Sequence, residues 1–196
     1  MKKLLSLVLL TGLLTQAQAM PALPVDNFSA GALPQDRRCT VAVSSPEVDF
    51  GIRSRWQMED AGPGNVLSPG VRTLTLSVSC PFSQAMHVSL RGDPAQDGNL
   101  RYGRAGSLRL RLLDAQLDGQ PVQLTPVSRD RIRQGSEQSS LPLKPGSGVV
   151  ASRNGSIITG KTFTARMEAR PLLPESEARV SSRQQSETRL TLDLIP

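Results

Sequence analysis

The stretch TLTLSVSC, residues 73–80, decides the fold class, because apolar and small polar side chains alternate along its whole length. Successive side chains of an extended chain point to opposite faces of a sheet, so this period of two is typical of a half-buried β-strand. One face carries Leu74, Leu76, Val78 and Cys80. The stretch CTVAV repeats the pattern and places Cys39, Val41 and Val43 on one face. Both cysteines are therefore expected on the apolar faces of their strands.

Further segments of strand character follow along the chain. They are residues 86–92, 107–119, 120–127, 148–160, 161–171 and 188–196. Gly, Asn, Asp and Pro separate these segments, as the reversals between short strands require. The polar residues 53–70 and 172–187 are interpreted as surface excursions, with a short helix allowed at 174–180. Short strands at near-regular spacing predict an all-β protein, an antiparallel β-sandwich.

Residues 1–19 have the three parts of a secretory signal peptide. A lysine pair precedes an apolar run, and the small residues Ala17 and Ala19 fit the cleavage rule. We expect cleavage before Met20 and export of the mature chain. No later segment approaches the roughly 20 apolar residues of a membrane helix, so no transmembrane segment is expected.

Cys39 and Cys80 are the two cysteines of the chain. An exported protein folds in an oxidising compartment, so one disulfide between them is the simplest expectation, with two buried free thiols as the alternative. A bridge that closes a loop of about 40 residues would stabilise the fold by about 4 kcal/mol on the chain-entropy estimate.

The formal net charge is +6, and arginine is the main basic residue. In residues 107–113 and 163–171 the arginines alternate with apolar side chains, which predicts solvated strand faces. Few aromatic residues are present to stack bases, so no nucleic-acid partner is expected.

No residue pattern of the chain predicts an enzyme. His87 is the single histidine, too few for a usual zinc site, and no GxSxG elbow accompanies it. We therefore expect no catalytic residues, no metal and no cofactor. The RGD tripeptide at 91–93 is explained by turn chemistry without a receptor.

Residues 20–38, before the first cysteine, contain three prolines and no strong alternation. Proline cannot donate a hydrogen bond to a strand ladder, so this segment is interpreted as an extended N-terminal arm outside the core. Residues 39–196 are then expected to form one domain.

The ordered motifs around the two cysteines resemble one family, the structural subunits (pilins) of bacterial chaperone-usher fimbriae. The resemblance rests on CTVAV at 39–43, VDFG at 48–51 and LTLSVSCP at 74–81, behind a signal peptide. LPLKPGSG at 141–148, ITGKTFTARMEARP at 158–171 and the alternating C-terminal strand support it. It covers the whole domain after the arm.

The resemblance implies an incomplete immunoglobulin-like β-sandwich of pilin type, which lacks its seventh strand and is completed by a donated strand. Val41 and Val43 would line one edge of the open groove. The other edge would be Leu190, Leu192 and Leu194, which alternate up to the end of the sequence. A periplasmic chaperone would contact these edges. An ordinary last strand, flanked on both sides in its own domain, is the alternative.

The resemblance also implies that residues 20–38 act as a donor strand in a neighbouring subunit. One phase of the segment presents Val25, Asn27, Ser29, Gly31 and Leu33. Gly31 matches the small residue that such donors carry near their middle, whereas Asn27 and Ser29 in apolar pockets would cost roughly 1–3 kcal/mol each if unpaired. The other phase, Phe28, Ala30 and Ala32, is apolar but short. This departure suits a minor subunit, and shaft, adaptor and terminator roles all stay open.

As such a subunit, the protein would pass through the periplasm with a pilus chaperone and an outer-membrane usher. It would join neighbouring subunits in a cell-surface fimbrium by donor-strand complementation and exchange, and contribute to cell adhesion. A secreted β-sandwich that binds carbohydrate or a host receptor is the alternative function. A two-domain tip adhesin is not expected, since it would need another domain of roughly 150 residues.

Overall fold

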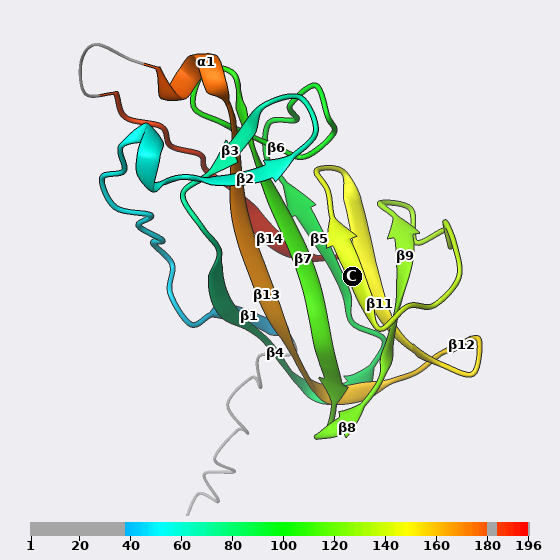
Figure 1. Cartoon of the computed structure of the whole chain (residues 1–196). Coiled ribbons are helices and arrows are strands. Elements are labelled where there is room, and N and C mark those ends of the chain that lie inside the picture. Colours follow the sequence, from blue (N-terminus) through cyan, green and yellow to red (C-terminus); the bar gives the residue numbers. More distant parts are fainter. Residues whose placement is uncertain (1–37, 180–183, 196) are drawn as a thin grey trace, which may run out of the picture. The chain divides into compact units, whose positions relative to one another are not determined.

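The structure, a computed structural model, describes residues 38–179 and 184–195 (Figure 1). Its strands form two antiparallel sheets, and helix is confined in these residues to the short turns η1 (Arg55–Gln57) and α1 (Glu175–Ala178). The all-β prediction is confirmed. The signal peptide and the arm up to residue 37 lie outside the described residues.

The first sheet is built around two long strands, β4 (Arg72–Gln84) and β13 (Gly160–Pro174), which pair along most of their length. β1 (Thr40–Val43) lies on the outer side of β4, and β7 (Gly106–Leu117) lies on the other side of β13. Shorter strands complete this sheet: β10 (Ser140–Leu143), β6 (Leu100–Tyr102) and β8 (Gln120–Pro121) pair with β7, and β3 (Val66–Ser68) and β2 (Glu59–Gly62) continue from the far end of β13.

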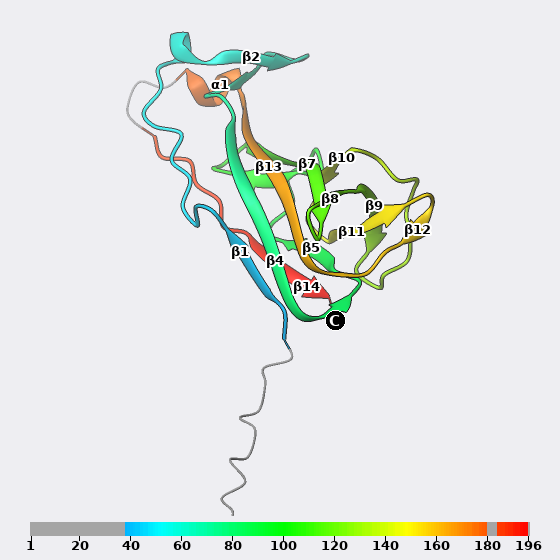
Figure 2. The same cartoon turned by 90° about the horizontal axis from the view of Figure 1, so that it is seen from below.

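The second sheet has β5 (His87–Arg91) between β11 (Ser147–Arg153) and β14 (Thr191–Ile195). β9 (Gln123–Ser128) pairs with the other edge of β11, and β12 (Ser156–Ile157) forms a hairpin with β11. In the described residues β14 is therefore an outer strand of the second sheet, as β1 is of the first (Figure 2).

The alternation in β4 produces the burial that the sequence predicts. Its inner face is buried and consists of Leu74, Leu76, Val78 and Cys80, whereas Thr73, Thr75 and Ser79 are exposed. The core that both sheets enclose is mainly aliphatic, and its least accessible side chains include Leu76, Val78, Val88, Leu90, Leu112 and Phe163. The prediction of solvated arginines is confirmed for Arg109, Arg111 and Arg166, which are exposed on the outer face of the first sheet, whereas Arg170 is partly buried.

A β-bulge interrupts the alternation of β7. Leu112 and Leu113 are both buried, and the pairing register with β13 shifts beside Asp114, whose φ is 52°. The extra residue moves the inward face from one phase to the other. The buried side chains are Leu108, Leu110 and Leu112 before the bulge, and Ala115 and Leu117 after it. Asp114 stays at the surface, 2.7 Å from Nη2 of Arg166.

The expectation that residues 53–70 and 172–187 are surface excursions is wrong at three leucines, Leu67, Leu172 and Leu173. Leu67 is 1% exposed and Leu173 is 7% exposed, and they are register partners where β3 pairs with the end of β13. β13 extends beyond the end of β4, and the β2–β3 hairpin pairs with this extension. A single buried leucine in a polar segment creates no period, so alternation could not reveal it.

The β-sandwich has two ends, which are named here by the residues that they carry. β4 ends at Gln84 and β5 begins at His87, so both strands meet at the end that carries Cys39, here the Cys39 end. β13 begins beside Gln84 and ends at Pro174, where α1 and η1 lie (Figure 1). η1 contains Trp56, and we call this opposite end the Trp56 end.

Candidate functional site: the edges of β1 and β14

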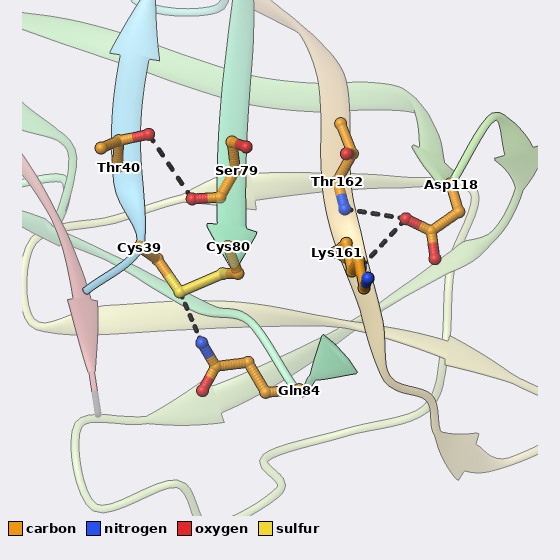
Figure 3. Close-up of a disulfide and its surroundings, with 8 residues drawn as sticks. All are labelled: Cys39, Thr40, Ser79, Cys80, Gln84, Asp118, Lys161 and Thr162. Atoms are coloured by element: carbon orange, nitrogen blue, oxygen red, sulfur yellow. Dashed lines mark hydrogen bonds between the residues drawn. A yellow bond between two sulfur atoms is a disulfide. The ribbon is translucent and has the colours of Figure 1, made fainter. Parts of the chain in front are cut away.

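β1 is fastened to β4 at both of its ends. The disulfide between Cys39 and Cys80 is confirmed and holds the first end, where the Gln84 amide also donates to Cys39 Sγ (Figure 3). At the second end, the Ser44 N–H donates to the Thr75 carbonyl at 2.9 Å, and the Thr75 N–H donates to Ser44 Oγ at 3.0 Å. The outer edge of β1 therefore has a fixed position.

β14 is fastened to β5 by side chains as well as by the ladder. The Arg91 guanidinium donates to both carboxylate oxygens of Asp193, at 2.9 Å for the Nη2 to Oδ1 bond. These bonds raise the pKa of Arg91 above its ordinary value. The Ser89 hydroxyl donates to the Asp193 carbonyl at 3.4 Å. Together these contacts fix the register of β14, with Leu192 opposite Leu90.

The two fastened strands are neighbours and run in opposite directions (Figure 2). β1 begins at the Cys39 end, whereas β14 ends there, with Ile195 opposite His87. Within residues 38–179 and 184–195, β1 pairs only with β4 and β14 only with β5. Each strand therefore has one edge whose backbone N–H and C=O groups lack a strand partner in that part of the chain.

Incomplete burial of the core is concentrated at these two edges. Nine partly buried hydrophobic side chains of the described residues pack against the core, and all but Tyr102 and Ile158 come from residues 39–48 and 190–194. The side chains at the edges are Cys39, Val41, Val43, Val48, Leu190, Leu192 and Leu194. All five predicted edge residues are in this group, so the structure brings Val41 and Val43 to the same side of the core as the three leucines.

Such an arrangement has a specific chemical capacity. An extended polypeptide between β1 and β14 would satisfy backbone groups of both edges through ladder hydrogen bonds. It would also cover the half-buried valines and leucines, at about 25 cal/mol for each Å² of apolar surface removed from water. The edges thus offer affinity through the backbone and selectivity through alternate side chains.

Of two hollows on the described surface, the first lies away from these edges, whereas the second adjoins the end of β1 at Ser44 and Val48. The first, of about 510 Å³, is lined by residues that include Asp118, Arg153 and Ile157. Asp118 is engaged in the turn there, because its Oδ1 accepts from the N–H groups of Lys161 at 3.0 Å and Thr162 at 2.8 Å (Figure 3). The second, of about 290 Å³, has a mainly polar lining, which residues of the segments 44–49 and 72–74 provide. Among the described residues, no group of three or more His, Cys, Asp and Glu side chains is placed to hold a metal ion.

His87 lies on the outer side of β5 and is 8% exposed. Burial lowers its pKa below the ordinary 6.5, and the positive charge of Arg131 lowers it further. The histidine is paired in register with Ile195, so it marks the last residue of the β14 ladder.

The RGD tripeptide is built into the β5–β14 pairing. The Arg91 side chain is bound to Asp193, and the Asp93 carbonyl accepts from the Arg101 N–H at 2.7 Å. A Cβ on Gly92 would lie 2.3 Å from Cδ2 of Leu100, so only glycine fits without a shift. These contacts explain the tripeptide structurally.

Sequence reasoning missed the exposed Trp56. This single tryptophan of the chain is 88% exposed on η1, and the Arg55 guanidinium lies 5.3 Å from its ring centroid. Arg55 is itself held by Glu175, at 3.0 Å from Nε and 2.7 Å from Nη2. The only sequence signal is a tryptophan in an otherwise polar segment.

The predicted donor strand belongs to the segment that precedes β1. Val25, Asn27, Ser29, Gly31 and Leu33 lie outside the described residues. Among the described residues, neither η1 nor α1 has the length that a membrane span requires.

No protein-family model matches the chain, and no curated protein matches it. The resemblance to fimbrial subunits therefore depends on the quoted sequence motifs alone.

Proposed function

We infer that the protein is an assembly subunit that accepts a β-strand from another polypeptide between β1 and β14. The observation that carries this proposal is the coincidence of two features. The strand edges without partners in the described chain are also where most of its half-buried core side chains gather. A sandwich with such an edge would aggregate unless something covered it.

The order of the strands supports the proposal. An immunoglobulin-type sandwich has sheet orders A-B-E-D and C-F-G. The first sheet here runs β1-β4-β13-β7, and the second ends with β5-β14. Read in chain order, β1, β4, β5, β7, β13 and β14 take the places of A to F. The vacant place is that of strand G, beside β14.

The source of the missing strand follows from the sequence resemblance. In pilin-type assembly, a periplasmic chaperone first supplies a strand, and the arm of a neighbouring subunit then replaces it. Residues 20–38, which precede β1, are the arm of this chain. In this proposal the protein is a fimbrial subunit. It is exported, is delivered to an outer-membrane usher and contributes to adhesion as part of a fibre.

The proposal is tested with a chain that complements itself. We define the arm fusion as the mature chain carrying a second copy of residues 20–38 after Pro196, joined by a four-residue linker. β14 ends at the Cys39 end, so a short reversal there allows the added segment to run back along its free edge. We expect the arm fusion to be monomeric and to melt at a higher temperature than the unfused mature chain.

The matched control carries Val25→Asp and Leu33→Asp in the added segment only. These changes keep its length and remove apolar side chains, so the control should aggregate like the unfused chain. A mature chain that purifies as a stable monomer, with the same melting temperature as the arm fusion, would overturn the proposed function.

A further inference from the structure

We propose that the exposed surface around Trp56 is a second contact site, which binds the folded part of the next copy of this chain in the assembly. The inference rests on the proposed function, since that next copy is the one whose arm lies between β1 and β14. In the assembly, this contact between the folded domains of two copies would add to the insertion of the arm.

The direction of the inserted strand decides which end of the sandwich the next copy faces. Since β1 and β14 run in opposite directions, an inserted strand is antiparallel to one and parallel to the other. Antiparallel ladders are slightly more stable, and β14 offers the longer edge. An arm antiparallel to β14 enters at the Cys39 end and leaves at the Trp56 end.

The length of the arm keeps the next copy close. If residues 25–33 occupy the edges, only residues 34–38 separate them from the donor's own Cys39. Five extended residues span at most about 17 Å. The first strand of the next copy must therefore begin within that distance of the point where the arm leaves the edges, on the side of the molecule that faces the Trp56 end.

Side-chain hydrogen bonds hold the surface at that end. The Ser54 N–H and hydroxyl both contact Oε1 of Gln57, at 2.9 and 3.1 Å, and close the turn that carries Trp56. Arg55 joins this turn to Glu175 of α1, which also accepts from Arg179 at 2.9 Å. A binding surface held in this way loses little conformational entropy when a partner docks.

The exposed side chains have the chemistry of a protein contact. Trp56 is 88% exposed and Ile52, four residues earlier, is 73% exposed. Tryptophan and arginine are the residue types most enriched where truncation weakens protein complexes. Apart from the Arg55 guanidinium, little of its own chain covers Trp56, so most of the ring is available to a partner.

The experiment compares two donors on one acceptor. The acceptor is the mature chain, refolded by dilution from guanidinium into an excess of donor. One donor is a synthetic peptide of residues 20–38, and the other is the arm fusion, whose own edges are filled and whose N-terminal arm is free. Each isolated complex is challenged with excess fluorescent peptide, and the rate of donor displacement is measured.

We expect Trp56→Ala in the acceptor to speed displacement of the arm fusion at least tenfold and to change displacement of the peptide less than twofold. Trp56→Phe in the acceptor should return the displacement rate of the arm fusion most of the way to the wild-type rate. The matched control is Phe82→Ala, because Phe82 is 52% exposed on β4 near the Cys39 end. It should affect neither donor.

Equal displacement of the arm fusion from wild-type and Trp56→Ala acceptors would overturn the inference and leave the proposed function intact. A tenfold effect of Phe82→Ala in place of Trp56→Ala would overturn it too, because the next copy would then face the Cys39 end. Failure of the peptide to bind the wild-type acceptor would instead remove the proposed function.

Discussion

The centre of the first sheet and the edges of β1 and β14 follow the same sequence rule and reach different degrees of burial. On β13 and β4, strands on both sides complete the ladder, and Phe163 and Val78 are at most 1% exposed. On β1 and β14, Val41 and Leu192 alternate with polar residues in the same way but are only partly buried. Alternation thus specifies which face is apolar, and the neighbouring strand determines whether that face is fully covered.

The largest expected effect is at the centre. Phe163→Ala removes a ring that packs between β4 and β7, and it should lower the free energy of unfolding of the arm fusion by about 3–5 kcal/mol. Guanidinium denaturation measures the change. Thr164→Ala, on the outer face of the same strand, is the control. A loss below about 1 kcal/mol for Phe163→Ala would show that the centre is not the main source of stability.

The disulfide joins the edge strand β1 to the central strand β4, and its removal should have the next largest effect on stability. Replacing Cys39 and Cys80 by serine should lower the free energy of unfolding by about 4 kcal/mol on the chain-entropy estimate. It should also weaken binding of the 20–38 peptide, because β1 loses the fastening at its first end. The same denaturation series on the reduced wild-type chain provides the comparison. Unchanged peptide binding in the serine variant would mean that the position of β1 does not depend on the bridge.

At the edge, Leu192→Ser should separate stability from strand binding. The side chain is only partly covered without a partner, so the unfolding free energy should change by about 1 kcal/mol, less than for Phe163→Ala. Binding of the 20–38 peptide should weaken more than tenfold, as measured by fluorescence anisotropy. Thr191→Ala, an exposed neighbour on the same strand, should leave binding unchanged. If both variants bound the 20–38 peptide equally well, the strand edge that accepts the peptide would have to lie elsewhere than on β14.

The smallest expected effect concerns pH at the end of the β14 ladder. Burial and Arg131 lower the pKa of His87 in the folded chain, whereas the unfolded chain keeps the ordinary 6.5. The unfolded state therefore binds the proton first as pH falls below 6.5, and stability should decline until pH reaches the lowered folded pKa. Urea midpoints of the arm fusion between pH 8 and 5 measure this decline. His87→Gln should remove the part of this decline in stability that His87 causes. If the urea midpoint of the variant depended on pH in the same way as that of the arm fusion, the assignment of the decline to His87 would be contradicted.

The sequence reveals strands more completely than it reveals their packing. Period two identifies β1, β4 and β14 and the face that each buries, because alternation depends on local geometry alone. It does not reveal the bulge at Asp114 or the burial of Leu67. Both depend on pairing with β13, which is distant in the sequence from either residue.

The candidate site divides in the same way. Cys39, Cys80 and the five edge residues could be named from phase and from the resemblance, because each lies on a regular strand. Trp56 could not, since its exposure arises from an irregular turn held by Glu175, far along the chain. No local pattern distinguishes a tryptophan that faces solvent from one that is buried.

The central claim, that β1 and β14 receive a strand between them, is tested most directly by amide hydrogen exchange. The exchange rates of residues 40–43 and 190–195 are compared in the mature chain alone and in its complex with the 20–38 peptide. We expect slower exchange in both segments on binding, and little change at the centre of β13, which is already protected. Unchanged exchange at both edges in a complex that forms, or protection confined to another surface, would contradict the claim.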